Sequence, residues 1–201
     1  MFDPRFARRR AARYRRKGLD PTARRMVDLL AGHGARGATV LEIGGGVGEI
    51  GLELLRRGAA SVTNLELSPA YEAEAAALAE EAGVAGRVHR RLVDIAVDPA
   101  EVEPADIVVL HRVVCCYPDH ARLLGAAAGH ARRRLVLSHP PRNPVSRTVV
   151  ATQNLLLRAA GRDFRTFAHP PAAMLAVLAD HGLHLTDVHR GPVWQIAAVA
   201  R

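Results

Sequence analysis

Four glycines fall within five positions of residues 38–51, which read ATVLEIGGGVGEIG. Apolar and β-branched residues precede them and a helical pattern follows, so they lie where a strand turns into a helix. Glycine permits positive φ and removes the Cβ that would hold a ligand away from the backbone. The free N–H groups and the dipole at the helix start attract an anion. This pattern predicts a nucleotide-type cofactor turn. The glycines expected at the ligand are Gly44, Gly45, Gly46 and Gly48.

Two motifs overlap in this turn. Residues 46–51 match G-x-G-x-x-G, the dinucleotide fingerprint, and residues 42–48 match acid-x-G-x-G-x-G. The first motif leaves Gly44 and Gly45 unexplained. The second gives Glu42 a role, because a carboxylate at a strand end can receive the ammonium of an amino-acid-bearing cofactor, directly or through water. A buried carboxylate without partners is costly, so we expect a ligand or backbone donors to satisfy Glu42.

Two further acids stand at the ends of later strands. Glu66 closes the strand predicted over residues 61–66, and an acid about 20 residues past such glycines commonly binds ribose hydroxyls. Asp94 follows the strand predicted over residues 87–93. Either acid could instead cap a helix or lie in a solvated loop.

Strand and helix patterns alternate from residue 39 onward, which predicts a doubly wound, mostly parallel sheet with helices on both faces. The last two of seven strands should form an antiparallel hairpin around Gly191 and Pro192. The predicted strands are 39–43, 61–66, 87–93, 107–110, 135–138, 183–190 and 193–200. The predicted helices of this α/β domain are 47–55, 69–82, 119–131, 145–160 and 171–180.

The N-terminus is strongly basic. Residues 1–17 hold eight basic side chains against one acid, and they predict a basic helix that ends near Gly18. A second helix should begin with Asp20 as N-cap and Pro21 at its first position.

We interpret residues 1–34 as an N-terminal helical arm and residues 35–201 as the ligand-binding domain. The arm is either solvated or a lid over the site, with Tyr14 as the aromatic contact of the lid.

The length, composition and charge of the chain limit the classes of protein to which it can belong. A chain of 201 residues suits one hydrophobic core. No stretch approaches the roughly 18 unbroken apolar residues of a membrane span, and no secretory signal is visible. Cys115 and Cys116 are the only cysteines and are adjacent, so we expect no disulfide framework and a cytoplasmic location. The formal net charge of +8 leaves nucleic acid open as a partner.

The order of these motifs resembles the class I S-adenosylmethionine-dependent methyltransferases over roughly residues 14–200. The segments that carry the resemblance are VLEIGGGVG at 40–48, NLELS at 64–68, LVDIA at 92–96 and ADIVVLHRVVCCYPD at 105–119. The predicted terminal hairpin also matches this family.

The resemblance implies S-adenosyl-L-methionine as cofactor, bound by the glycine turn with Glu42 toward its ammonium. Glu66, with Leu67 beside it, would hold the ribose hydroxyls. Asp94 and the backbone N–H of Ile95 would hold the adenine. A nicotinamide oxidoreductase remains an alternative, but the dinucleotide fingerprint explains Glu66 and neither of the other two acids.

The expected chemistry is in-line transfer of a methyl group from a sulfonium cation. Positioning can account for about 7–11 kcal/mol of barrier lowering, and a general base for about 10²–10⁴-fold, so positioning should dominate. His111 follows the fourth strand and is the best base candidate, or else a ribose contact. Tyr117 and Tyr14 are the other residues expected at the acceptor. Cys115 and Cys116 are more commonly small buried hydrophobes than nucleophiles.

A narrower resemblance is to the magnesium-protoporphyrin O-methyltransferases. Tyr-Pro at 117–118, RLVLS at 134–138 and a pair of helices before a short hairpin carry it, with Tyr14 as a further counterpart. Cys116 departs from it, since a histidine is expected there. This resemblance implies O-methylation of a carboxylate on a large flat substrate; a small-molecule acceptor, methylated at a carboxylate or hydroxyl oxygen, is the broader expectation.

Two other classes stay open. The basic arm could grip RNA phosphates in an RNA or protein methyltransferase, whose binding would weaken steeply with salt. The chain could also be a non-enzymatic protein that keeps a cofactor fold. His181 and His184 straddle Gly182 without compact ligand spacing, so we expect no metal. The sequence predicts no particular oligomeric state.

Overall fold

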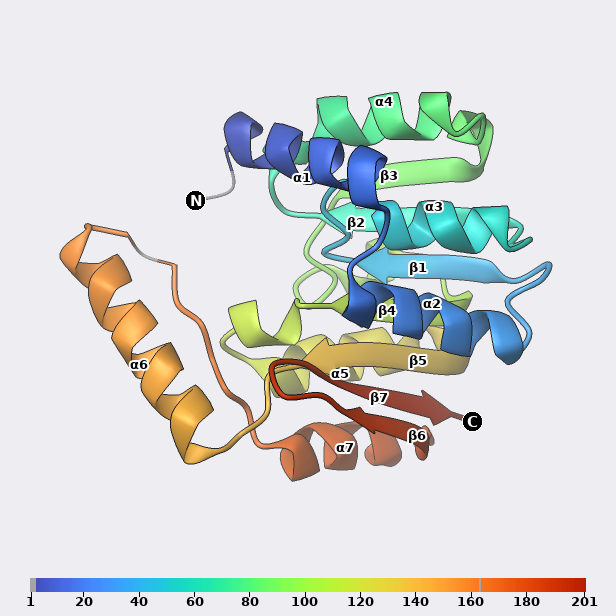
Figure 1. The fold of residues 1–201 in the computed structure, drawn as a ribbon. Coiled ribbons are helices and arrows are strands. Elements are labelled where there is room, and N and C mark those ends of the chain that lie inside the picture. Colours follow the sequence, from blue (N-terminus) through green and yellow to red (C-terminus); the bar gives the residue numbers. More distant parts are fainter. Residues whose placement is uncertain (1–2, 163) are drawn as a thin grey trace.

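The computed structural model describes residues 3–162 and 164–201. A seven-stranded sheet runs through the molecule between two layers of helices (Figure 1). Its strands are β1 (Thr39–Ile43), β2 (Ser61–Glu66), β3 (Val88–Leu92), β4 (Ala105–His111), β5 (Ala131–His139), β6 (His184–Arg190) and β7 (Gln195–Ala200).

The strand order is β3-β2-β1-β4-β5-β7-β6. β1 to β5 pair in parallel, and β7 runs antiparallel to both β5 and β6. The predicted α/β class is confirmed, as is the mostly parallel seven-stranded sheet with its antiparallel terminal hairpin. The carboxyl ends of β1, β2 and β4 therefore meet along one edge of the sheet, where parallel sheets bind ligands.

The helices divide between the two faces of the sheet. Those of the first face contribute to one hydrophobic cluster and those of the second face to another. On the first face lie α1 (Pro4–Lys17), α2 (Pro21–Gly32), α3 (Glu49–Arg56) and α4 (Glu72–Glu81). On the second face lie α5 (His120–Gly129) and α7 (Pro171–Asp180).

Alternation along the central strands supplies both clusters. In β1, Val40 packs in the first cluster and Leu41 in the second; in β4, Val109 and Val108 do the same. Because successive side chains of a strand point to opposite faces, a strand covered on both faces is apolar throughout. This explains why both strands could be predicted from the sequence.

α1 ends and α2 begins where the sequence predicts, while residues 1 and 2 of the predicted basic helix lie outside the described residues. The Asp20 side chain accepts from the backbone N–H groups of Thr22 and Ala23, with Pro21 first in α2. Gly18 follows α1 with a φ of 65°. Both helices pack into the first cluster, so α1 and α2 share a core with the sheet. The interpretation of these residues as a separate functional arm stays a prediction.

Several predicted boundaries were wrong, and the largest difference is at the start of β5. β5 begins at Ala131 rather than Leu135, because the exposed or half-exposed arginines at 132–134 disguise the start of the strand. The helix expected over 119–131 ends at Gly129, where the chain turns directly into β5.

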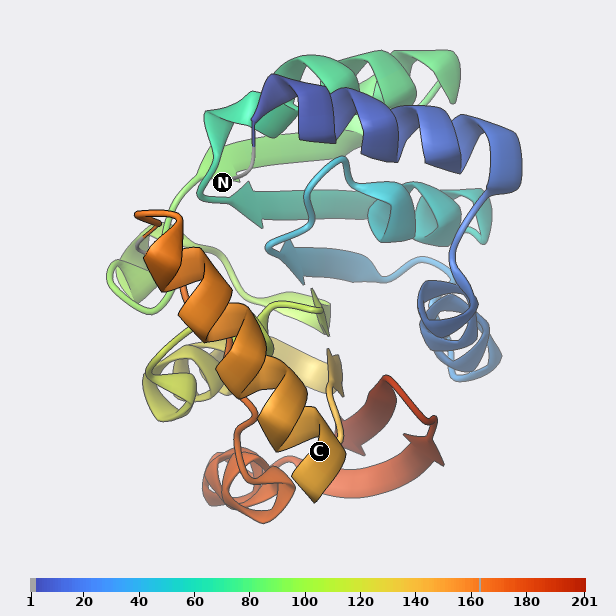
Figure 2. The same ribbon diagram turned by 60° about the vertical axis from the view of Figure 1, so that its left-hand side comes forward.

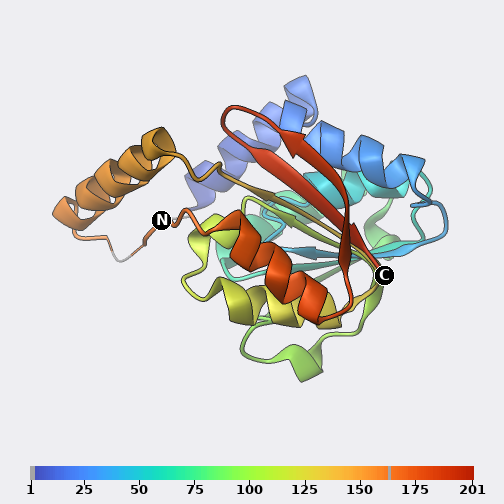
Figure 3. The same ribbon diagram turned by 90° about the horizontal axis from the view of Figure 1, so that it is seen from below.

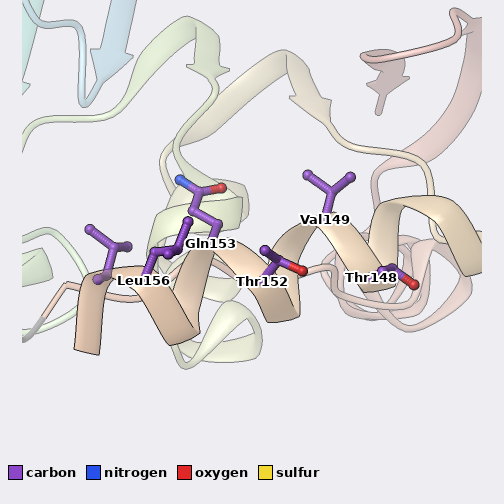
Figure 4. A pocket seen from close by; sticks show the side chains of 6 residues that line it. Thr148, Val149, Thr152, Gln153 and Leu156 are labelled. Atoms are coloured by element: carbon purple, nitrogen blue, oxygen red, sulfur yellow. The ribbon is translucent and has the colours of Figure 1, made fainter. Parts of the chain in front are cut away.

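One helix stands away from the two layers. α6 (Pro144–Ala159) projects beside the carboxyl edge of the sheet in three views (Figures 1, 2 and 3), and none of its residues is buried. Figure 4 shows Val149, Gln153 and Leu156 on one side of this helix, where they help to line a shallow pocket. Within residues 3–162 and 164–201, no helix has the length and apolar character needed to cross a bilayer.

Candidate cofactor and acceptor site

The glycine turn connects β1 to α3 and requires glycine for two reasons. Three of its residues have positive φ, namely Gly44 (63°), Gly46 (58°) and Gly48 (80°). Gly45 has no such φ, but a Cβ there would overlap the side-chain amide of Asn64. The turn is therefore fixed by backbone conformation and by close packing on the strand beside it.

Glu42 lies at the base of the turn and is 2% exposed. One carboxylate oxygen accepts from the backbone N–H of Gly51 at 3.2 Å and from Asn64 Nδ2 at 2.9 Å. Burial, with the neighbouring Glu49 carboxylate, raises the pKa of Glu42 to about 8. The donors that a buried carboxylate needs thus come from the start of α3 and from β2.

Glu66 reaches across the turn from the end of β2. Its Oε2 accepts from Gly46 N at 2.9 Å, and its Oε1 accepts from the N–H groups of Leu67 and Ser68 at 2.8 and 3.1 Å. The side chain of Leu67 itself is exposed. The carboxylate is consequently held at the mouth of the glycine turn.

The third acid is linked to a residue expected at the acceptor. Asp94 accepts from the Tyr117 hydroxyl at 3.0 Å and from Ala96 N at 3.0 Å, while Ile95 is buried in the second cluster. The Tyr117 hydroxyl bond joins the segment after β3 to the segment after β4, so the adenine and acceptor positions expected from the sequence are neighbours.

The amino-terminal half of α1 lies against the turn. Arg10 forms an ion pair with Glu49, the first residue of α3. The Phe6 ring meets the edge of Tyr71, which is the nearest neighbour of a Cβ placed on Gly46. These contacts place residues of the basic arm beside the predicted ligand position.

Tyr14 lies further along α1, away from these contacts. Its hydroxyl donates to Glu53 Oε1 at 2.8 Å and accepts from Arg56 at 3.2 Å, both on α3. The structure thus places Tyr14 between α1 and α3, and the lid role predicted for it stays a prediction.

His111 ends β4 and is 8% exposed. Its Nδ1 lies 2.9 Å from Ser138 Oγ on β5, and its Nε2 lies 3.4 Å from Asp20 Oδ2 at the start of α2. Burial lowers the pKa of His111, and only part of this effect is offset by Asp20. Both ring nitrogens are occupied by side chains of the protein.

Arg112 completes this cluster. It is the one non-glycine with positive φ in the described part of the chain, at 59°. Its backbone N–H donates to Ser138 Oγ at 2.9 Å, its guanidinium pairs with Asp20 at 3.2 Å, and it lies 4.9 Å over the Trp194 ring. The cluster joins α2, β4, β5 and the terminal hairpin, which are distant in sequence.

Several buried polar atoms around the turn lack partners. Among residues 3–162 and 164–201, Glu49 Oε2, Asn64 Oδ1 and Arg90 Nη1 make no hydrogen bond. Arg90 Nη1 and the Asn64 amide are also the nearest atoms to a Cβ placed on Gly48. Unsatisfied donors and acceptors beside a glycine turn suit a polar ligand or water, so these residues fit an adenosyl amino acid. The same ranges hold no cluster of three or more potential metal ligands.

Residues 40–134 match the family model described as a methyltransferase domain. The segment contains the glycine turn, the three acids and His111. This match supports the predicted class I methyltransferase fold over these residues. Domains of this class use S-adenosyl-L-methionine as methyl donor, and the sheet order and terminal hairpin of this chain agree with that fold. A search of curated sequences found no significant match.

Solved structures share the fold of this chain. A magnesium protoporphyrin IX methyltransferase from Synechocystis with bound SAH is 24% identical, with a TM-score of 0.73 over 90% of this chain and 82% of that chain. An O-methyltransferase family protein from Burkholderia thailandensis is 21% identical, with a TM-score of 0.75 over 99% of this chain and 60% of that one. An O-methyltransferase family 2 protein from Planctomyces limnophilus in complex with apigenin is 22% identical, with a TM-score of 0.66 over 89% of this chain and 61% of that one.

Sequence reasoning missed three contributors to the site. Asn64 could have been noticed as an amide inside a buried strand, whereas Asp20 was recognised only as a helix cap. Arg10 carried no signal among the other arginines of the arm. The ligand roles predicted for the acids, the glycines and the two tyrosines stay predictions.

Proposed function

We propose that this chain transfers a methyl group from S-adenosyl-L-methionine to an oxygen of a small-molecule acceptor. One observation carries the proposal: Glu42, Glu66 and Asp94 lie at or just beyond the carboxyl ends of three adjacent parallel strands, and Glu42 and Glu66 pack against the glycine turn. A dinucleotide needs only the second of these acids. Gly51 of the dinucleotide fingerprint is explained by packing, since a Cβ there would contact Val62 and Glu42.

The roles follow from the contacts. Glu66 would accept hydrogen bonds from the ribose hydroxyls and would give up part of its hydrogen bonding to the glycine turn. Asp94 would accept a hydrogen bond from the adenine amino group beside Tyr117. The turn and Glu42 would hold the amino-acid end. The bound cofactor supplies an electrophilic methyl on a sulfonium, and the protein orients the acceptor toward it and excludes water.

Two features favour an oxygen acceptor on a flat apolar molecule. A groove of about 660 Å³ between α6 and residues 166–168 is lined by Phe167, Arg142 and Arg147, among others. Arginines beside apolar surface suit a carboxylate on an apolar frame. Because both nitrogens of His111 are occupied, a carboxylate acceptor, which needs no base, suits the site. Two structural neighbours, a magnesium protoporphyrin IX methyltransferase and an O-methyltransferase in complex with apigenin, are associated with large flat molecules.

The test is binding of S-adenosylhomocysteine to Glu66→Ala by calorimetry. Leaving two ribose hydroxyls unpaired should cost about 1–3 kcal/mol, or about 5- to 150-fold in Kd. Glu80→Ala, an exposed acid on α4, is the matched control and should bind like the wild type. Wild-type affinity in Glu66→Ala would refute the assignment of the ribose. Transfer of a radiolabelled methyl group to protoporphyrin or a flavone would test the acceptor class.

A second candidate is an RNA methyltransferase. It is favoured by the outer face of α1, where Arg8, Arg9, Arg13 and Arg16 are exposed. Each phosphate contact would add about one unit to the slope of log affinity against log salt concentration. Binding to single-stranded RNA that is weak and independent of salt would exclude this candidate.

A further inference from the structure

The two cysteines lie in a short 3₁₀ turn, η4 (Val114–Cys116), between β4 and α5. Their sulfurs are 3.7 Å apart. Both sulfurs also lie near one carbonyl, that of Arg112, at 3.6 and 3.7 Å. Adjacent residues of an extended chain would direct their side chains apart, so this turn brings two thiols to the same side of the backbone.

The two thiols differ in access and acidity. Cys115 is 8% exposed, whereas Cys116 is only partly covered. The contact between the two sulfurs lowers the pKa of Cys116 and raises that of Cys115. Cys116 is therefore the entry point for an electrophile, with a second thiol in contact behind it.

We propose that Cys115 and Cys116 form a two-thiol site for a soft, thiophilic trivalent centre such as an organoarsenical, and that occupation of this site weakens cofactor binding. The hydrated reagent, R–As(OH)₂, is attacked by the Cys116 sulfur and then by the Cys115 sulfur. Two As–S bonds form and two As–O bonds break. The two thiol protons leave with the two hydroxides as water. Arsenic stays trivalent, so no oxidant or reductant is needed.

The turn that carries the thiols touches the cofactor side of the domain. Val113, just before it, lies where a Cβ on Gly44 would sit, at 2.7 Å. Tyr117, just after it, donates to Asp94. An arsenic atom bonded to both sulfurs has to fit in η4, between the contacts of Val113 and Tyr117. Any movement of η4 that makes room for it is therefore transmitted to the glycine turn and to the predicted adenine position.

The same turn also touches the acceptor side. The Cys115 carbonyl accepts from Phe167 N at 2.7 Å, and Phe167 lines the groove beside α6. Occupation of the thiol site should therefore disturb both sides of the active site. The thiol site goes beyond the proposed methyl transfer, since arsenical binding is measured without acceptor or turnover.

The experiment uses the full chain and phenylarsine oxide, with Cys115→Ser and Cys116→Ser as matched variants. The wild type should take one phenylarsenic group, measured by intact mass, and lose both free thiols. Because the second bond is intramolecular, we expect the wild type to bind about 10²–10⁴-fold more tightly than either variant. A dithiol such as 2,3-dimercaptopropanol should reverse the adduct, and an equal concentration of monothiol should not.

The coupling is measured as the Kd of S-adenosylhomocysteine before and after arsenical addition. Weaker binding in the wild type, with no change in Cys116→Ser, is the expected result. Equal arsenical affinity in the wild type and both variants would overturn the two-thiol site. A full adduct with unchanged cofactor affinity would overturn the coupling. Circular dichroism of each variant verifies that loss of binding does not reflect unfolding.

Discussion

The burial of Glu42 should make the stability of this domain depend on pH. Its carboxyl group has a pKa of about 8 against an ordinary value of 4.5. Between these two values the folded state holds a proton that the unfolded chain has released. The unfolding free energy therefore falls as pH rises through this window, and it levels off once the folded state also releases the proton.

The size of the effect follows from the width of that window. At about 1.4 kcal/mol for each pH unit, the full loss approaches about 5 kcal/mol. Between about pH 5 and pH 8 the loss should be on the order of 3 kcal/mol. Glu42→Gln removes the titration but keeps an oxygen that can accept from Gly51 and Asn64. Between about pH 5 and pH 8, the unfolding free energy of this variant should therefore increase by about 3 kcal/mol relative to that of the wild type.

Urea unfolding of the two proteins at several pH values measures the difference. Glu80→Gln, on the exposed face of α4, is the control and should run parallel to the wild type. Parallel curves for wild type and Glu42→Gln would show that Glu42 is ionised in the folded state throughout. The burial argument would then be refuted.

The same titration should couple to the ligand. If the cofactor ammonium pairs with ionised Glu42, binding of S-adenosylhomocysteine releases a proton from the folded protein. Affinity should then rise with pH, by up to about tenfold per unit, until the carboxyl group is ionised. Calorimetry in buffers of different ionisation enthalpy measures the released proton directly, and Glu42→Gln should show neither effect.

Three further perturbations test the structure around the site. Tyr14→Phe loses the bond to Glu53 and should cost about 1 kcal/mol in urea unfolding, with unchanged S-adenosylhomocysteine affinity; weaker affinity would place Tyr14 at the ligand. Gly45→Ala should cost about 1–3 kcal/mol through overpacking, and a double-mutant cycle with Asn64→Ala should recover part of that loss. Arg10→Gln should speed S-adenosylhomocysteine dissociation in stopped-flow experiments, and an unchanged rate would exclude a lid role for this part of α1.

The strand ends were predictable because local signals coincide there. β1 and β2 have the predicted bounds, since each run has an acid at or next to its end, Glu42 or Glu66, and a glycine or proline within three residues of that acid. The glycine turn was likewise predictable, because only glycine suits both the positive φ values and the close approach of β2. Parallel pairing then brings the ends of β1 and β2 together without further information.

The contacts between distant segments could not be predicted in this way. His111 and Asp20 are 91 positions apart, and nothing local to either residue signals their meeting. The exposed face of α6 shows a different limit. Val149 and Leu156 have the spacing of a buried stripe, yet they are 58% and 65% exposed, because periodicity reports amphipathicity and not what covers the helix.

The position of His111 bears on how much catalysis the protein itself can supply. Burial lowers the pKa of this imidazole, and Ser138 and Asp20 contact its two nitrogens. To act as a base, His111 would have to break its contact with Asp20 and contact the acceptor instead. The buried Asp20 carboxylate would then keep only its contacts with Arg112 and the backbone N–H groups at the start of α2. A general base accelerates a reaction about 10²–10⁴-fold, which corresponds to about 3–5 kcal/mol of barrier lowering. Positioning can lower the barrier by about 7–11 kcal/mol, which is more. We therefore infer that His111 fixes the end of β4 against α2 and β5, and that methyl transfer here depends on orientation.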